Sequence, residues 1–214
     1  MTIETIACPE CGKPPGVCIC DRVEKVATQL RVVILQHPQE DDALLGTAKL
    51  VEVTLPKAEV RVGLSWASLD QAIGARNADR ERWAVLAVAK LPVPVPGEAR
   101  SEPVVVIDRK GRLRDLKRHG LEGIIVLDGT WSQAKTLWWR NAWLLKLPRV
   151  VLQPREPSMY GRLRKEPRKE WVSTLEAIGD VLPALGEPEA VRSNLRRLLR
   201  TLLQRARDQA TISP

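Results

Sequence analysis

The chain has 214 residues, of which 44% are hydrophobic and 28% are charged, a composition typical of a globular protein with one substantial core. Its formal net charge of +8 favours a polyanionic partner, although a basic surface without a dedicated partner is the alternative. Because no run of about eighteen apolar residues occurs and the N-terminal residues lack a signal-peptide pattern, we expect no membrane span and a cytoplasmic protein.

All four cysteines lie near the start of the chain, at Cys8, Cys11, Cys18 and Cys20. The C-x2-C spacing is typical of a metal knuckle, and the C-x-C pair can supply two further thiolates. Four thiolates without a nearby histidine indicate a closed structural zinc site, with a redox pair or a metal cluster as alternatives. We therefore expect residues 1–26 to form a zinc-binding segment that needs its metal to fold, followed by one domain over residues 27–214.

Apolar runs alternate with helical patterns through the remainder of the chain. The apolar runs predict strands at residues 30–35, 59–64, 83–88, 104–107, 124–127 and 150–152. The helical spacing predicts helices at residues 43–53, 69–75, 131–138, 173–178 and 189–210. Strands that alternate with helices in this way indicate an α/β fold with a largely parallel sheet.

Polar residues follow two of the predicted strands at their carboxyl ends, where open α/β sheets bind their ligands. Gln36, His37 and Glu40 follow the first strand, and Asp128 with Thr130 follows the strand at 124–127. These side chains could hold a ligand. The alternatives are that Asp128 and Thr130 only cap the next helix and that His37 is a satisfied structural histidine.

A basic loop follows the last predicted strand. Its cations are interleaved with aromatic residues, and it contains Arg155, Tyr160, Arg162, Arg164, Lys165 and Arg168. Basic groups contact phosphates and aromatic faces stack on unpaired bases, so the loop favours RNA binding over a merely solvated surface. Ser173 and Glu176, which come next, fit a capping box, and the arginine-rich last helix is either a second polyanion surface or a solubilising face.

Several of these segments occur together in the DTW-domain family, which the chain resembles over nearly its whole length. The resemblance is carried by CPECGKPPGVCIC at 8–20, QHPQE at 36–40, GTAKL at 46–50, LDGTW at 127–131, LPRVVL at 147–152, SMYGRLR at 158–164 and STLEAI at 173–178. Residues 104–120 look like extra material, and Lys49 stands where the family pattern has arginine.

The resemblance implies a tRNA-uridine aminocarboxypropyltransferase, which transfers the 3-amino-3-carboxypropyl group of S-adenosylmethionine to N3 of a uridine and releases 5′-methylthioadenosine. It also implies a SPOUT-like fold with a knotted chain and helices on both faces of the sheet. The alternatives are a SPOUT-like RNA methyltransferase, a ribosomal RNA aminocarboxypropyltransferase and a non-catalytic, zinc-containing RNA-binding module.

Site residues follow from the resemblance by position. S-adenosylmethionine is expected at Gln36, His37, Glu40, Thr47, Leu127, Asp128, Gly129, Ser132, Gln133, Leu152, Ser173, Thr174 and Glu176. Catalysis is expected from Asp128, Thr130 and Trp131. Asp128 either accepts the N3 proton, holds the uracil edge or binds the amino group of the ligand. RNA contacts are expected from the basic loop, and Cys8, Cys11, Cys18 and Cys20 are the expected zinc ligands.

Overall fold

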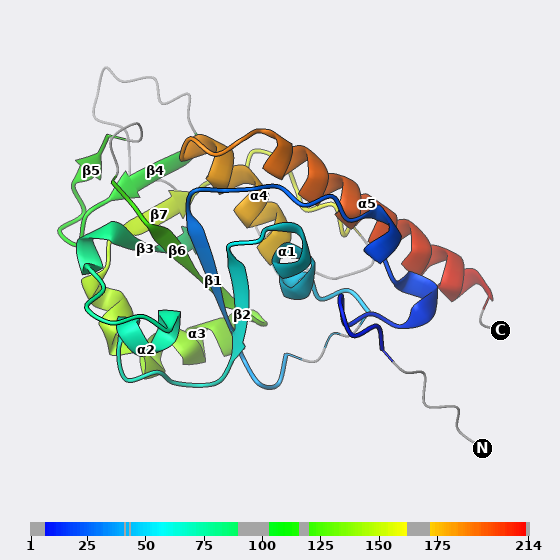
Figure 1. Cartoon of the computed structure of the whole chain (residues 1–214), viewed down its shortest axis with the longest axis horizontal. Coiled ribbons are helices and arrows are strands. Elements are labelled where there is room, and N and C mark those ends of the chain that lie inside the picture. The colour runs from blue at the N-terminus through cyan, green and yellow to red at the C-terminus, as the bar shows by residue number, and fades with distance from the viewer. Residues whose placement is uncertain are drawn as a thin grey trace.

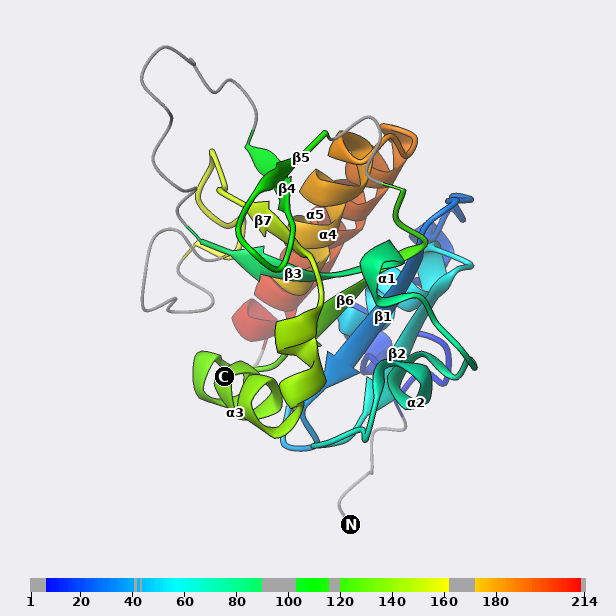
Figure 2. The same cartoon turned by 90° about the vertical axis from the view of Figure 1, so that its left-hand side faces the viewer.

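The computed structural model describes residues 7–40, 42, 44–89, 103–115, 120–161 and 172–212, which form a seven-stranded sheet with helices packed against it (Figures 1 and 2). The sheet order is β2-β1-β6-β3-β7-β4-β5. The strands are β1 (Arg31–Gln36), β2 (Ala58–Val62), β3 (Trp83–Val88), β4 (Val104–Ile107), β5 (Leu113–Arg114), β6 (Gly123–Asp128) and β7 (Arg149–Leu152). The first five strands of this order are parallel, and β4 and β5 add an antiparallel hairpin beside β7. The predicted α/β class and largely parallel sheet are confirmed.

The central strands are apolar on both faces because both faces are covered. In β1, Val32 and Ile34 join one core cluster, and Val33 and Leu35 join another on the opposite face. Successive side chains of a strand point to opposite faces, so a continuous apolar run suits this position.

Helices cover the two faces separately. The helices that contribute to the larger core are α1 (Ala48–Thr54), α4 (Thr174–Ala184) and α5 (Ala190–Ile212). The other core is built with α2 (Leu69–Ile73), the C-terminal part of α3 (Trp131–Arg140) and the short 3-10 helix η5 (Ala142–Lys146). In Figure 1, α4 and α5 lie alongside each other, and they make extensive mutual contacts. No described helix is long and apolar enough to cross a membrane.

Two local features differ from the sequence-based expectation. Helix α1 begins at Ala48 and not near residue 43, because the preceding residues form a turn in which Asp42 accepts hydrogen bonds from the amides of Leu45 and Gly46. Strand β5 was not predicted, since two residues are too short to show a strand period.

The cysteine segment packs onto the rest of the chain. Val17 and Ile19 are fully buried in the larger core, and Arg205 of α5 binds Asp21 through two hydrogen bonds, at 2.9 and 2.8 Å. The segment therefore shares its apolar core with the α5 side of the sheet.

Candidate functional site

The Asp128 carboxylate lies at the carboxyl end of β6, in the interior of the sheet. It is 7% exposed, and its Oδ2 accepts a hydrogen bond from Gln36 Nε2 at 2.8 Å while its Oδ1 accepts one from the hydroxyl of Thr174. Gln36 ends the neighbouring strand β1, and Thr174 is the first residue of α4. Because buried carboxylates need hydrogen-bond donors, these two partners fix the orientation of Asp128. Each oxygen keeps a lone pair for one further donor.

The turn from β6 into α3 requires glycine at position 129. Gly129 has φ +145°, and a Cβ there would lie 2.9 Å from both Cβ and Oε1 of Gln133 and 3.4 Å from Cβ of His37. A side chain at this position would therefore be strained by its backbone conformation and by its neighbours. The absence of a side chain lets the first turn of α3 and the loop after β1 approach Asp128 closely.

Helix α3 begins with a capping box. The Thr130 hydroxyl accepts a hydrogen bond from the Gln133 amide at 3.4 Å, and Gln133 Oε1 accepts one from the Thr130 amide at 2.6 Å. The capping role weighed for Thr130 from sequence is thus present in the structure. Trp131 is 64% exposed, and the neighbouring Ser132 is exposed as well, so both face away from the core at the edge of the site.

The loop after β1 is attached to the same turn. The His37 amide donates to the backbone oxygen of Asp128 at 3.0 Å, and His37 Nδ1 accepts from the Gln39 amide at 3.1 Å. Gln133 Nε2 donates to the backbone oxygen of Gln39 at 3.0 Å, and the Glu40 amide donates to the backbone oxygen of His37 at 2.9 Å. His37 is buried, so in this arrangement it holds the loop against β6, as expected of a structural histidine.

Glu176 ties the start of α4 to the loop that follows β7. Its buried carboxylate accepts hydrogen bonds from Ser158 Oγ at 2.8 Å, from the Met159 amide at 2.7 Å and from the Ser173 amide at 2.8 Å. The Ser173 hydroxyl accepts in return from the Glu176 amide at 3.1 Å, which completes a capping box. The first turn of α4, which carries Thr174, is thereby held against Asp128.

Tyr160 has a different place from the one expected for an RNA-binding aromatic residue. Its side chain is 1% exposed, and its hydroxyl donates to the backbone oxygen of Leu45 at 2.5 Å. The ring therefore has no free face on which a base could stack, because the residues ahead of α1 pack over it. Next to this contact, Thr47 Oγ1 accepts from the Leu175 amide at 3.4 Å, which joins the start of α1 to the start of α4.

Lys13 is a buried residue of this region that sequence reasoning missed. It comes from the cysteine segment, is 3% exposed and donates to the backbone oxygen of Gly46 at 2.5 Å. Burial lowers the pKa of Lys13 to about 8, against the opposing effect of the Asp42, Cys11 and Asp128 charges. A lysine usually lies on the surface, so the sequence held no signal for this position.

The remaining predicted residues lie in three kinds of place. Leu152, at the end of β7, is fully buried, and Leu127 is partly buried against the second core. Arg155 is exposed beyond β7. The other predicted RNA-binding cations, Arg162, Arg164, Lys165 and Arg168, lie outside the described residues.

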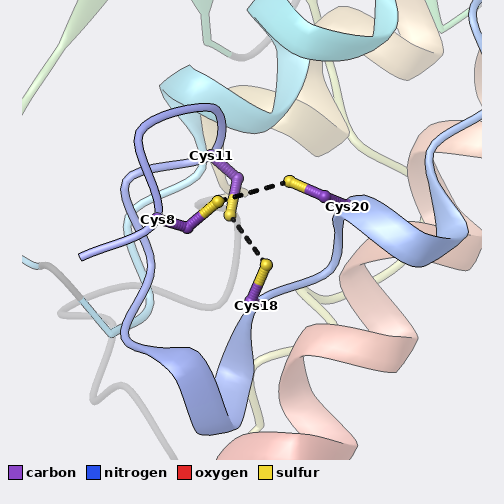
Figure 3. A group of neighbouring side chains, drawn as sticks. All are labelled: Cys8, Cys11, Cys18 and Cys20. Carbon is purple, nitrogen blue, oxygen red and sulfur yellow. Dashed lines mark hydrogen bonds between the residues drawn. The ribbon is translucent and has the colours of Figure 1, made fainter. Parts of the chain in front are cut away.

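The four cysteines converge as predicted and could hold a metal ion. Their sulfur atoms all lie within 4.8 Å of one another, with Cys8 and Cys20 separated by 3.6 Å and Cys11 and Cys18 by 3.7 Å (Figure 3). Four thiolates about 2.3 Å from a tetrahedral metal would have sulfur–sulfur distances of about 3.8 Å. The cluster therefore fits a four-coordinate site with no open position.

The local environment also favours a thiolate at one of these positions. Backbone N–H groups of Cys11 and Glu10 lower the pKa of Cys8 to about 7, whereas burial raises the pKa of Cys20. The thiolate is the form that binds metals, so these backbone groups favour metal binding at Cys8.

Taken together, the edge formed by β1, β6 and α4 presents one oriented carboxylate that accepts hydrogen bonds from a hydroxyl and from a side-chain amide. Such a set can bind a ligand that carries hydrogen-bond donors and can fix its orientation. The four cysteines, which leave no ligand position open, can supply structural support but no Lewis acid to this edge.

The sequence was compared with known proteins. The model of the DTW domain family matches residues 5–207. The chain is 26% identical over 205 residues to tRNA-uridine aminocarboxypropyltransferase 2 of Mus musculus, a match that covers 91% of this chain and 61% of the mouse protein. It is 28% identical over 211 residues to the protein of the same name from Drosophila melanogaster, with 96% of this chain and 76% of that protein covered.

A plant relative shows a similar likeness. The chain is 26% identical over 226 residues to tRNA-uridine aminocarboxypropyltransferase A of Arabidopsis thaliana, with 95% of this chain and 80% of that protein covered. The chain spans only 61% of the length of the mammalian relatives that it matches. No solved structure matches the chain. Because the family model covers almost every residue, including the Asp128 turn and the four cysteines, this chain belongs to the DTW domain family.

Proposed function

We propose that the protein is a tRNA-uridine aminocarboxypropyltransferase that uses S-adenosylmethionine as donor and modifies N3 of a uridine. The observation that carries this proposal is the likeness, along 91–96% of the chain, to relatives named tRNA-uridine aminocarboxypropyltransferase. The oriented Asp128 carboxylate at the carboxyl edge of the sheet adds a site that suits the reaction.

The reaction is a displacement at the γ-carbon of the methionine moiety. The bond between uridine N3 and this carbon forms while the carbon–sulfur bond breaks, and the sulfur keeps the electron pair as 5′-methylthioadenosine leaves. The N3 proton must also leave, because the neutral imide is a poor nucleophile. Since the sulfonium is already a good leaving group, the main task of the protein is to align N3 with the γ-carbon.

Asp128 is the central residue in this proposal. Gln36 and Thr174 leave one lone pair open on each of its oxygens, so it can accept the N3 proton, hold the uracil edge or bind the ammonium group of the donor. Thr130 and Trp131 would border the uridine, Thr130 as a hydrogen-bonding group and Trp131 as an aromatic wall. Both residues directly follow Gly129 in the turn from β6 into α3.

The donor is proposed to lie along the same edge of the sheet. Gln36, Thr47 and Thr174 bring polar groups to it, Leu127 brings apolar surface, and the fully buried Leu152 supports the edge from the core. The other proposed contacts are His37, Glu40, Gly129, Ser132, Gln133, Ser173 and Glu176. Among these, His37, Gln133 and Glu176 already make the hydrogen bonds described above, so their part is to hold the loops that shape the site.

For the metal we propose zinc, because four thiolates in a closed tetrahedral arrangement are typical of structural zinc sites. In this proposal, the zinc-binding segment at residues 1–26 stabilises the fold, and the domain at residues 27–214 binds the donor and the tRNA. The proposed cellular site is the cytoplasm, and Arg155 is the described member of the proposed RNA-binding loop.

The finer fold assignment is also a proposal. The parallel run β2-β1-β6-β3-β7 and the helices on both faces support a SPOUT-like architecture. An experimental structure in which the chain after β7 does not pass through a loop of the backbone would remove the knot from this assignment.

The decisive experiment replaces Asp128 and identifies the products. Wild-type protein, incubated with unmodified tRNA transcript and S-adenosylmethionine, is expected to give a 3-amino-3-carboxypropyl uridine and 5′-methylthioadenosine by mass spectrometry. Asp128→Asn is expected to lower the rate by at least about a hundred-fold, whereas Asp79→Asn, at the opposite edge of the sheet, is expected to retain it. Release of S-adenosylhomocysteine by the wild type would show a methyltransferase instead, and full activity in Asp128→Asn would remove Asp128 from the mechanism.

Calorimetry separates the roles of Asp128. If the carboxylate binds the ammonium of the donor, Asp128→Asn weakens the binding of S-adenosylmethionine. If it accepts the N3 proton or holds the uracil edge, donor binding is retained while transfer is lost. If the protein modified a uridine of ribosomal RNA and none of tRNA, the proposed reaction would stand, and the proposed RNA substrate would be wrong.

A further inference from the structure

Helix α3 carries an exposed stripe of two tryptophans and a lysine, Trp131, Lys135 and Trp139. These residues are spaced four apart, so they lie on one face of the helix. Trp131 and Trp139 are 64% and 67% exposed, and Lys135 is exposed between them. The opposite face holds the helix on the sheet, because Leu137 is fully buried and Trp138 packs against the second core. The stripe therefore points outward.

Two tryptophans with most of their surface in water are unusual, since tryptophan carries a large apolar area that folding normally covers. The chain uses tryptophan for seven of its eight aromatic residues, and it buries Trp83 and Trp143 in the core next to this helix. Tryptophan is therefore not exposed throughout this protein, and the exposure of Trp131 and Trp139 is particular to this face of α3.

The charge of the helix points to a particular kind of partner. Residues 131–140 contain no acidic residue, and Lys135 and Arg140 are both exposed cations. Indole rings stack on unpaired bases, and a cation between two such rings is well placed for the phosphate that joins the bases. An apolar protein partner would need no lysine between the rings.

We propose that the stripe Trp131–Lys135–Trp139 is the docking surface for the unpaired nucleotides of the RNA substrate that flank the target uridine. This inference rests on the proposed function for the identity of the RNA. Trp131 stacks on the base nearest the site, Lys135 binds the backbone phosphate, and Trp139 stacks on a base further along the strand.

The stripe begins close to Asp128, which supports its proposed role in docking the nucleotides beside the target uridine. Trp131 comes three residues after Asp128, and α3 follows directly from the carboxyl end of β6 (Figure 2). With a rise of about 1.5 Å per residue, the eight steps from Trp131 to Trp139 span about 12 Å along the helix. A single strand of two or three nucleotides covers that distance, so an RNA loop on the stripe would deliver the next nucleotide to Asp128.

The test compares three variants of the full-length protein at one fixed salt concentration. Trp139→Leu keeps an apolar side chain without an aromatic face, and it is expected to weaken binding of a labelled, unmodified tRNA by a factor between about 5 and 150, the range for loss of one base stack. Trp139→Phe keeps an aromatic face and is expected to recover most of the affinity. Lys110→Ala, on the turn between β4 and β5, is the control for loss of an exposed lysine and is expected to bind as the wild type.

Lys135 gives an independent readout. Lys135→Ala is expected to reduce the slope of log Kd against log salt by about one phosphate contact, whereas Lys110→Ala keeps the wild-type slope. Binding of a short single-stranded RNA is expected to depend on Trp139. Binding of the same RNA annealed to its complement is expected not to depend on Trp139, because paired bases offer no free face.

Any of three RNA-binding results would overturn the inference: equal tRNA affinity of Trp139→Leu and wild type, an affinity of Trp139→Phe as low as that of Trp139→Leu, or equal dependence of single-stranded and duplex RNA binding on Trp139. A change in self-association without a change in RNA binding would assign the stripe to a protein interface and would also overturn it. The proposed function is tested separately by product analysis of the wild type. If the wild type makes the modified uridine while Trp139→Leu binds tRNA normally, only the docking surface fails. If the wild type makes no product, the proposed function fails, and the RNA-binding comparison still decides the stripe.

Discussion

Asp128 receives its two hydrogen bonds from residues that lie far apart in the sequence. Gln36 is 92 residues before it and Thr174 is 46 residues after it. From the sequence, Asp128, Gln36 and Thr174 could each be singled out by their position after a strand or at a helix start. Their mutual contacts could not, because these depend on which strands are neighbours. Lys13 had no sequence signal at all, since only tertiary packing buries it.

The hydrogen bond from the Thr174 hydroxyl to Asp128 can be removed by a single substitution that changes little else. Thr174→Val keeps the shape of the side chain but leaves Asp128 Oδ1 without this donor. We expect the free energy of unfolding to fall by about 1.5–3 kcal/mol, the usual contribution of a hydrogen bond to a charged group, and the transfer rate to fall with it. Urea unfolding and initial rates measure the two effects.

Thr174→Ser is the matched control because it restores the hydroxyl. Its stability and activity should return towards those of the wild type. If Thr174→Ser were as impaired as Thr174→Val, the methyl group and not the hydroxyl would be the important part of Thr174.

Helices and strands were predicted with different success along the chain. Strands β3 and β4 have the predicted bounds, which are marked by Arg82 just before β3 and by Asp108 just after β4. The start of α1 was placed about five residues too early, since the turn at Asp42, the Lys13 contact and the Tyr160 contact all involve backbone groups that a helix would otherwise use. The sequence predicts the capping box of α4 and a capping role for Thr130 in α3, and both are present.

The capping box of α4 does more than end a helix, because Glu176 also binds the loop after β7. Glu176→Gln would place an amide among four donors that now face a carboxylate. We expect a loss of about 2–4 kcal/mol in the free energy of unfolding and, for a chain of this size, a fall in Tm of roughly 5–15 °C. Thermal unfolding followed by circular dichroism measures this change.

Glu189→Gln provides the comparison for Glu176→Gln, since Glu189 is an exposed carboxylate near the start of α5. Its replacement should change the Tm by less than about 2 °C. A similarly small change in Glu176→Gln would show that the loop after β7 does not depend on this carboxylate.

At the scale of the whole molecule, the cysteine segment is joined to the rest of the chain by apolar packing, ion pairs and hydrogen bonds. Val17 and Ile19 enter the larger core, Arg205 of α5 binds Asp21, and Lys13 reaches Gly46 beside α1. The sequence predicted a separate small unit at residues 1–26. It could not show this attachment, because the partners of the segment are up to 187 residues away.

Removal of the metal is therefore expected to affect the whole protein. Treatment with a strong chelator should lower the Tm by more than about 5 °C and should expose the segment around residues 8–22 to proteases. Donor binding, measured by calorimetry, should weaken because Lys13 no longer holds the residues ahead of α1. Differential scanning calorimetry with limited proteolysis checks these effects.

Adding one equivalent of zinc back should restore the Tm and the protease resistance, and Cys18→Ser should behave like the chelated protein before and after the addition. A Tm that is unchanged by chelation, in protein shown by elemental analysis to have lost its metal, would contradict a structural metal.

The distant contacts of the cysteine segment also set the point in synthesis at which the fold can be completed. Arg205, the ion-pair partner of Asp21, is made 184 residues after it, and Thr174 is made after both Asp128 and β7. Contacts this distant in sequence form slowly and late. A nascent chain that has not yet released α4 and α5 therefore has an Asp128 without its hydroxyl donor and a cysteine segment without its contacts to α5. Such a chain leaves apolar surface uncovered for longer than a protein built from local contacts does.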